Sequence, residues 1–281
     1  MKKPQLITII TALFFVAIIF LFGRTIPLKS SSKAVNNGQS TTTGNLTDTI
    51  LNMAKRELRP DQLTRLASLE ASISGATSKD QKLEVYHQLA HFWKDSAGFL
   101  LPFAFYEGET ARLENSENSL TFAARLFLEN LQQEQSLDFR RWEALQAKDL
   151  FERSLIINPN NDSAKIGLGA CYLFGNISAA PMEGIGKIKE VLDRDSTNVY
   201  GQMMMVRGSL MSGQYEKAIS RLQLVYQLKP NNLEAILLLA DTYERINDKS
   251  NALKWYERSV PLVTNAEMKT AIEKRIEDLK K

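Results

Sequence analysis

The sequence is poor in the residues that most covalent and metal chemistry requires. It contains one cysteine, Cys171, which excludes an intramolecular disulfide. Cys171 lies in an apolar helical pattern without a neighbouring base, which is typical of a small buried residue and not of a nucleophile. Only two histidines are present, and the formal net charge of +3 at pH 7 is too small to predict a nucleic-acid surface.

The two histidines, His87 and His91, lie four residues apart and therefore on one face of a predicted helix. Zinc proteases use this spacing, but Gln88 stands in the place of their general base, and a structural metal would need two further ligands. We therefore predict no catalytic residue, no metal and no cofactor. An enzyme or metal site built around these histidines and the irregular region 96–145 is the alternative.

Glycine-rich phosphate-binding motifs are also missing. Gly167 and Gly169 fall within a helical pattern and not after a strand, so they do not predict a dinucleotide-binding turn. Gly184 and Gly186 follow Pro181, and this pattern favours a loop or the frayed start of a helix.

One long uncharged segment is present, over residues 6–23, and it is almost free of polar side chains. Its length is close to the roughly twenty residues that a helix needs to cross a membrane. A cleavable signal peptide would have a shorter apolar region and a cleavage site of small residues, which residues 23–27 do not offer. The sequence therefore predicts a membrane anchor helix within residues 1–27.

The orientation of this anchor follows from its flanks. Lysines and arginines nearly balance on the two sides, but the chain begins Met-Lys-Lys, as signal anchors do. We therefore expect a single-pass protein of the bacterial inner membrane, with a cytoplasmic N-terminus and the body in the periplasm. Residues 28–45 are rich in Ser, Thr, Asn and Gly, and they predict a flexible tether.

The body, from residue 46 onward, has helical periodicity and contains a repeat. The tripeptide at 159–161, Pro-Asn-Asn, recurs 71 residues later at 230–232, a distance of two 34-residue periods plus three. Alternating small and large residues follow the same register, and proline ends the second helix of a unit. The residues predicted to pack the repeats are Gly169, Tyr172, Ala218, Ala240, Tyr243, Ala252, Phe151, Pro159 and Pro230.

These residues make the chain resemble the tetratricopeptide repeat family, including uncharacterised bacterial membrane-anchored members. The resemblance implies an all-α fold, a right-handed superhelical solenoid of helical hairpins, preceded here by one transmembrane helix. It divides the body into degenerate hairpins over 46–159, regular repeats over 160–264 and a capping helix over 265–281. A single hairpin cannot bury its apolar face, so at least three must stack.

The region 46–159 departs most from the repeat, but its helices can still be placed. An N-terminal pair is expected over 47–59 and 61–74. Two degenerate hairpins are expected, the first over 83–93 and 102–113. The second covers 120–131 and 142–157, with a Gln-rich connection and about eleven residues more than the repeat length.

In the resembled family, the first helix of each hairpin lines a concave groove in which peptides bind. Methionine suits such adaptable apolar contacts, although the methionines of this chain would also fill a core. The register places these candidates in the groove: Tyr200, Met203, Arg207, Met211, Glu234, Leu237, Asp241, Arg245, Ile166, Ala170 and Phe174.

The sequence therefore predicts a membrane-anchored scaffold or adaptor that binds a protein partner, and not an enzyme or a nucleic-acid binder. Cell-envelope assembly, secretion and quality control are the processes that we expect it to serve. Self-association through the repeats is compatible with the same pattern, and the identity of the partner does not follow from the residues.

Overall fold

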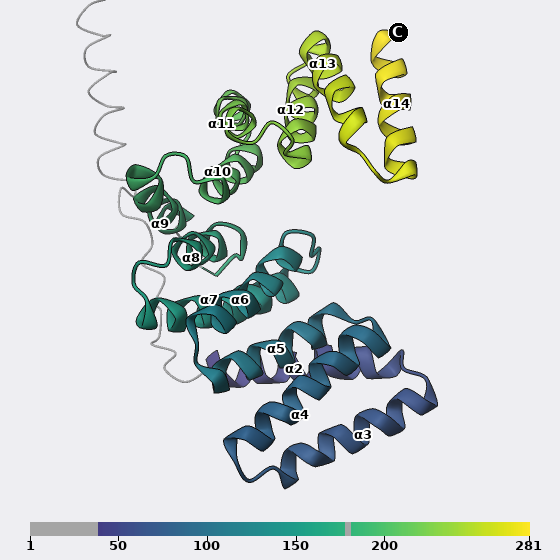
Figure 1. Cartoon of the computed structure of the whole chain (residues 1–281), viewed down its shortest axis with the longest axis vertical. Coiled ribbons are helices and arrows are strands. Elements are labelled where there is room, and N and C mark those ends of the chain that lie inside the picture. The colour runs from purple at the N-terminus through teal and green to yellow at the C-terminus, as the bar shows by residue number, and fades with distance from the viewer. Residues whose placement is uncertain (1–38, 178–180) are drawn as a thin grey trace, which may run out of the picture. The chain divides into compact units, whose positions relative to one another are not determined.

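Helices make up all the regular structure of the part of the chain that the computed structural model describes, residues 39–177 and 181–281 (Figure 1). The predicted anchor at 1–27 lies outside these residues. No helix within them is long and apolar enough to cross a membrane. The α-helices are α2 (Gln39–Arg56), α3 (Pro60–Gly75), α4 (Lys79–His91), α5 (Leu100–Glu114), α6 (Glu117–Leu131), α7 (Leu137–Ile157), α8 (Asp162–Phe174), α9 (Pro181–Arg194), α10 (Val199–Met211), α11 (Tyr215–Leu228), α12 (Leu233–Arg245), α13 (Lys249–Ser259) and α14 (Ala266–Lys280).

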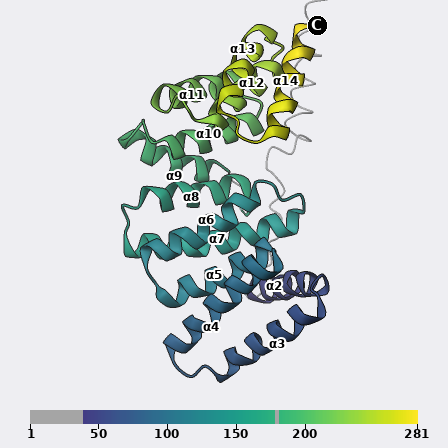
Figure 2. The ribbon, with the colours of Figure 1, turned by 45° about the vertical axis from the view of Figure 1, so that its right-hand side comes forward.

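Successive helices from α4 to α13 pair as hairpins, and each hairpin also packs on the next (Figure 2). The pairs are α4 with α5, α6 with α7, α8 with α9, α10 with α11 and α12 with α13. The partners run antiparallel, as the ion pair between Asp162 at the start of α8 and Arg194 at the end of α9 shows. Helix α14 packs on α13 through Ile272 and Ile276, which are buried while most of the helix is exposed.

The close approach within the α8–α9 hairpin depends on two glycines. A Cβ atom at Gly169 would lie 2.7 Å from the carbonyl oxygen of Gly184 and 2.7 Å from a side-chain carbon of Ile188. A Cβ at Gly184 would in turn meet the carbonyl oxygen of Gly169 at 2.3 Å. Gly184 thus lies inside a helix and not in a loop, and the two backbones touch because neither residue has a side chain.

Four of the eight remaining residues predicted to pack the repeats are fully buried. Phe151, Ala218, Ala240 and Ala252 have no exposed surface, whereas Tyr172 and Tyr243 are half-buried. Pro159 and Pro230 are exposed in the turns that follow the second helix of a hairpin. Cys171 is fully buried, and burial raises the pKa of its thiol well above the usual range, so it is an inert core residue.

Asparagine begins the first helix of four successive units. The side-chain oxygen of Asn161 accepts a hydrogen bond from the backbone N–H of Ala164 at 2.9 Å, which caps α8. Asn198, Asn232 and Asn265 cap α10, α12 and α14 in the same way. The Asn-rich turns of the sequence are therefore helix N-caps, as their composition predicts.

Helices α2 and α3 cover most of the residues predicted for the N-terminal pair, but α2 begins at Gln39, within the segment predicted as a tether. Ile50 and Ala54 are buried along one face of α2, and Leu58 is buried in the turn that follows it. A helix fixed by such contacts can extend into polar sequence. The indole N–H of Trp142 on α7 donates a hydrogen bond to the Thr47 hydroxyl at 2.9 Å. These contacts join α2 to the hairpins.

Part of the insertion of about eleven residues lies in α7, which has 21 residues where α9 and α11 have 14 each. The connection is the five-residue stretch 132–136, as predicted, and the insertion adds turns to the start of α7. Trp142, in these added turns, is buried and packs edge-on against Phe127. The aromatic side chains of region 96–145 therefore serve mainly in the core, with Phe103 and Tyr106 buried in α5.

Helix α4 continues directly into a short π-helix, Phe92–Ala97, which ends at Gly98 with a φ angle of 77°. The wider turn buries both Phe92 and Trp93. Gln62 of α3, itself buried, donates a hydrogen bond to the carbonyl oxygen of Ser96 at 2.6 Å. The irregular turn is thereby fixed against the neighbouring helix.

Candidate partner-binding groove

Three adjoining cavities open along the side formed by the first helices α6, α10 and α12. Their volumes are about 500, 440 and 720 Å³, in order from the start of α6 toward the end of α10. Glu129 lines all three cavities. Three further residues line both the middle and the largest cavity: Gln132, Arg207 and Glu234. We call this continuous depression the groove.

Six of the eleven residues predicted for the groove line these cavities. The middle cavity is lined by Tyr200, Met203, Arg207 and Glu234. The largest cavity is lined by Arg207 and Glu234 again, and by Phe174 and Met211. Leu237, Asp241 and Arg245 do not line any of the three. Asp241 instead accepts a hydrogen bond from the Tyr256 hydroxyl at 2.5 Å, which ties α12 to α13.

Ile166 and Ala170 on α8 have no exposed surface, so the structure places them in the core and not on a wall of the groove. The cause is the approach of α6 and α10 over α8. The guanidinium of Arg125 on α6 lies 5.4 Å from the ring centre of Tyr200 on α10, a cation–π contact that bridges the two helices. Burial raises the pKa of Tyr200 to about 12, so its phenol is neutral at physiological pH.

The sequence allows the methionines either to fill the core or to line the groove, and the structure contains both cases. Met203 and Met204 are buried and fill the core, although both also form the floor of the middle cavity. Met211 is 67% exposed at the end of α10. Together with Leu210, Leu238 and Phe174 it gives the largest cavity an apolar wall.

Two ion pairs line the groove, one between helices and one within a helix. Arg207 on α10 and Glu234 on α12 form an ion pair at 2.5 Å. Arg125 and Glu129, one turn apart on α6, lie 3.7 Å apart. An apolar wall crossed by paired charges can orient a peptide and exclude mismatched partners.

The wall formed by α6 was not predicted, although the register contains it. Ala124 and Phe127 correspond in the repeat to Val206 and Ser209, so Arg125 corresponds to Arg207. The same offsets select Asn118, Thr121 and Glu129 on α6, and all of these residues line the groove. They were missed because the long insertion after α6 made its hairpin seem too irregular to carry the register.

The histidines lie away from this groove, on α4. The Nδ1 atom of His91 lies 3.0 Å from an Asp95 carboxylate oxygen, and the Nε2 atom of His87 lies 3.6 Å from a Glu114 carboxylate oxygen. The two rings thus contact different carboxylates. Within the described residues, no group of three or more His, Cys, Asp or Glu side chains could hold a metal ion.

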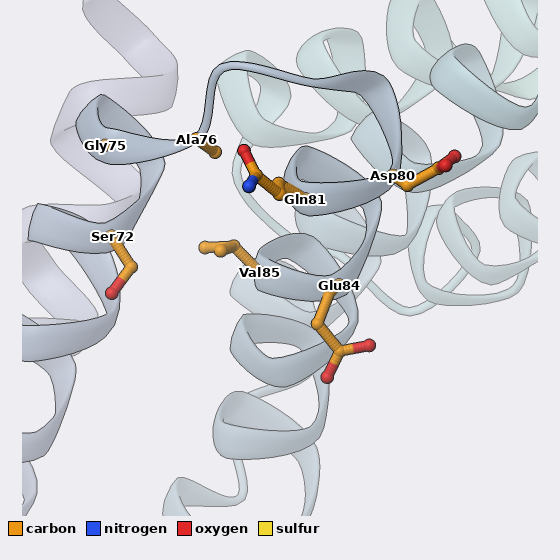
Figure 3. A pocket seen from close by; sticks show the side chains of 7 residues that line it. All are labelled: Ser72, Gly75, Ala76, Asp80, Gln81, Glu84 and Val85. Carbon is orange, nitrogen blue, oxygen red and sulfur yellow. The ribbon is translucent and has the colours of Figure 1, made fainter.

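A further cavity of about 550 Å³ lies between the end of α3 and the start of α4 (Figure 3). Its lining residues include Ser72, Asp80, Glu84 and Val85, and the acidic side chains point away from Ser72. The amide of Gln81 faces it but already accepts hydrogen bonds from the backbone N–H groups before α4. This cavity contains no set of free polar groups directed at one point.

Comparison with known proteins agrees with the repeat. Residues 209–274 match the family model of the tetratricopeptide repeat. A tetratricopeptide repeat protein from Parabacteroides merdae, known from a crystal structure, is 14% identical with a TM-score of 0.53, over 86% of this chain and 88% of that one. This likeness shows the fold.

A curated relative is similar in sequence to half of the chain. Lipopolysaccharide assembly protein B of Haemophilus influenzae is 26% identical over 143 residues, which are 50% of this chain and 35% of that protein. The match therefore spans about a third of the length of the relative.

Proposed function

Because the chain is built from tetratricopeptide repeats, we propose that it is a membrane-anchored adaptor that holds a protein partner in the groove of α6, α10 and α12. Solenoids of helical hairpins bind partners on such extended concave surfaces. The observation that carries the proposal is the continuity of the three cavities, which Glu129 joins. Together they offer both apolar and charged contacts to a peptide segment.

The cell envelope is the proposed location. The uncharged run at residues 6–23 supports a single-pass anchor, and Lys2 and Lys3 before this run support a body in the periplasm. The similarity to a lipopolysaccharide assembly protein supports a role in envelope assembly, over the half of the chain that matches. A reporter enzyme fused after Lys281, together with external protease, tests this location. Activity of a periplasmic reporter is expected, and activity of a cytoplasmic one would contradict it.

No reaction is assigned to the chain. The two histidines contact separate carboxylates, and the aromatic residues of region 96–145 are largely used in packing. Neither feature favours the alternative of an enzyme or metal site.

A pair of exposed apolar residues allows a matched test of the groove. Met211 lies in the groove and is 67% exposed, while Ile156 on α7 is 80% exposed and lines none of the three cavities. We expect proteins that copurify with the full chain from its own membrane to fall at least tenfold with Met211→Asp and to persist with Ile156→Asp. Equal losses, or no reproducible partner of the unaltered chain, would contradict the proposal.

A further inference from the structure

The groove carries an excess of positive charge that the chain does not neutralise itself. Its cations are Arg125, Arg140, Arg207 and Lys229, and its anions are Glu129 and Glu234. Each anion already has a cation of its own, Arg125 for Glu129 and Arg207 for Glu234. Two positive charges are therefore left over.

The two remaining cations occupy different cavities of the groove. Lys229, in the turn between α11 and α12, lines the middle cavity, and its ammonium forms no ion pair within the described part of the chain. Arg140, at the start of α7, lines the largest cavity and donates hydrogen bonds to the backbone carbonyl of Glu134 but to no carboxylate that the structure describes. Both can therefore attract an incoming anion.

The apolar wall of Met211, Leu210 and Leu238 lies in the same cavity as Arg140, next to the cavity of Lys229. The Arg207–Glu234 pair stands at the boundary of the two cavities. A ligand that contacts both cations therefore extends across the Arg207–Glu234 pair and enters the cavity that holds the apolar wall. Phosphate groups alone would leave that surface uncovered, whereas a peptide can supply apolar and acidic side chains in alternation.

We infer that the groove selects an acidic peptide segment in which an apolar side chain packs on Met211 and carboxylates face Lys229 and Arg140. The inference rests on the proposed partner-binding function and adds the chemistry of the partner. Because these cations are solvent-accessible, the attraction acts mainly on selectivity and association rate, and salt screens it at distances beyond a Debye length of about 8–10 Å.

The test uses the purified full chain in detergent and a phage library that displays random dodecapeptides. Enrichment of Asp and Glu within a few positions of Leu, Met or Phe is expected. A selected peptide should then bind Lys229→Glu at least tenfold more weakly than the unaltered chain in fluorescence anisotropy. Lys254→Glu is the matched control, since Lys254 is an exposed lysine on α13 that lines none of the three cavities.

The possible outcomes separate this inference from the function on which it rests. Selected peptides that are basic or purely apolar, or that bind Lys229→Glu unchanged, would overturn the acidic specificity and leave a peptide-binding groove. A library without any selected sequence would contradict both. Displacement of the peptide by phosphatidylglycerol vesicles, but not by neutral vesicles, would assign the cations to a lipid surface and also overturn the inference.

Discussion

Glu143 is the residue whose chemistry departs most from that of a surface side chain. It lies on α7 without exposed surface; one carboxyl oxygen accepts a hydrogen bond from the Asn130 amide at 2.8 Å, and the other has no partner. The pKa of Glu143 is raised to about 8, chiefly by burial and also by the charge of Glu134, while the hydrogen bond from Asn130 and the charge of Arg140 act in the opposite direction. A carboxyl group in this setting is protonated at neutral pH.

This shift makes folding stability depend on pH. The pKa of Glu143 is higher in the folded chain than its ordinary value of 4.5, so its contribution is fully present below about pH 4.5 and is lost as pH rises through about 8. Between pH 5 and 8 we expect the unfolding free energy of the unaltered chain to fall by on the order of a few kcal/mol. Glu143→Gln should abolish this fall. Urea unfolding at several pH values measures it. Glu216→Gln, at an exposed position on α11, should leave the dependence of unfolding free energy on pH unchanged. The same pH dependence in the unaltered chain and both variants would contradict the account.

Gly169 offers a second test at the scale of one residue. An added Cβ would meet the backbone oxygen of Gly184, which cannot move without shifting α9. We expect Gly169→Ala to destabilise the fold by about 1–3 kcal/mol, as overpacking does. Gly186→Ala is the control because nothing lies within 4 Å of its added Cβ, and alanine at this helical position should stabilise by about 0.5–1 kcal/mol. Thermal unfolding that ranks the two variants in the opposite order would refute the close packing.

The helices themselves were largely predictable, because caps and periodicity are local signals. The sequence predicts α14 over the residues that form it, and it predicts the partners of the α4–α5 and α6–α7 hairpins. It did not predict the start of α2, because the helix gains its stability from burial of Ile50 and Ala54 against distant segments. The sequence also did not decide whether Gly184 lies in a loop or at the start of a helix. Only its contact with Gly169 explains why a glycine is needed inside α9.

The recurring asparagine caps lead to a prediction about whole elements. Asn232 accepts the backbone N–H of Ala235 at 3.0 Å and so begins α12, whereas Asn231 beside it is exposed. We expect Asn232→Ala to cost about 1 kcal/mol and Asn232→Asp to cost less, because aspartate can accept the same bond. Asn231→Ala should be near neutral. Chemical denaturation of the four proteins measures the difference, and similar losses at 231 and 232 would show that the cap is not the cause.

At the scale of the whole molecule, the position of the groove depends on which helices approach one another. The repeat register predicts its α10 and part of its α12 walls, and the same register extended to α6 supplies Asn118, Arg125 and Glu129. It could not predict that Ile166 and Ala170 are covered, because that depends on the contact between Arg125 and Tyr200 across α8. Register therefore places residues on a face of a helix, and only the packing of neighbouring hairpins decides whether that face is open.

The most direct test of the account is photocrosslinking in living cells with benzoylphenylalanine in place of Met211 or of Ile156. Both positions are exposed and apolar, and only Met211 lies in the groove. The account predicts a discrete crosslinked protein from position 211 that is absent from position 156 and is lost when Arg207 is also changed to Glu. Crosslinks of equal yield from both positions, or none from position 211, would contradict a partner-binding groove.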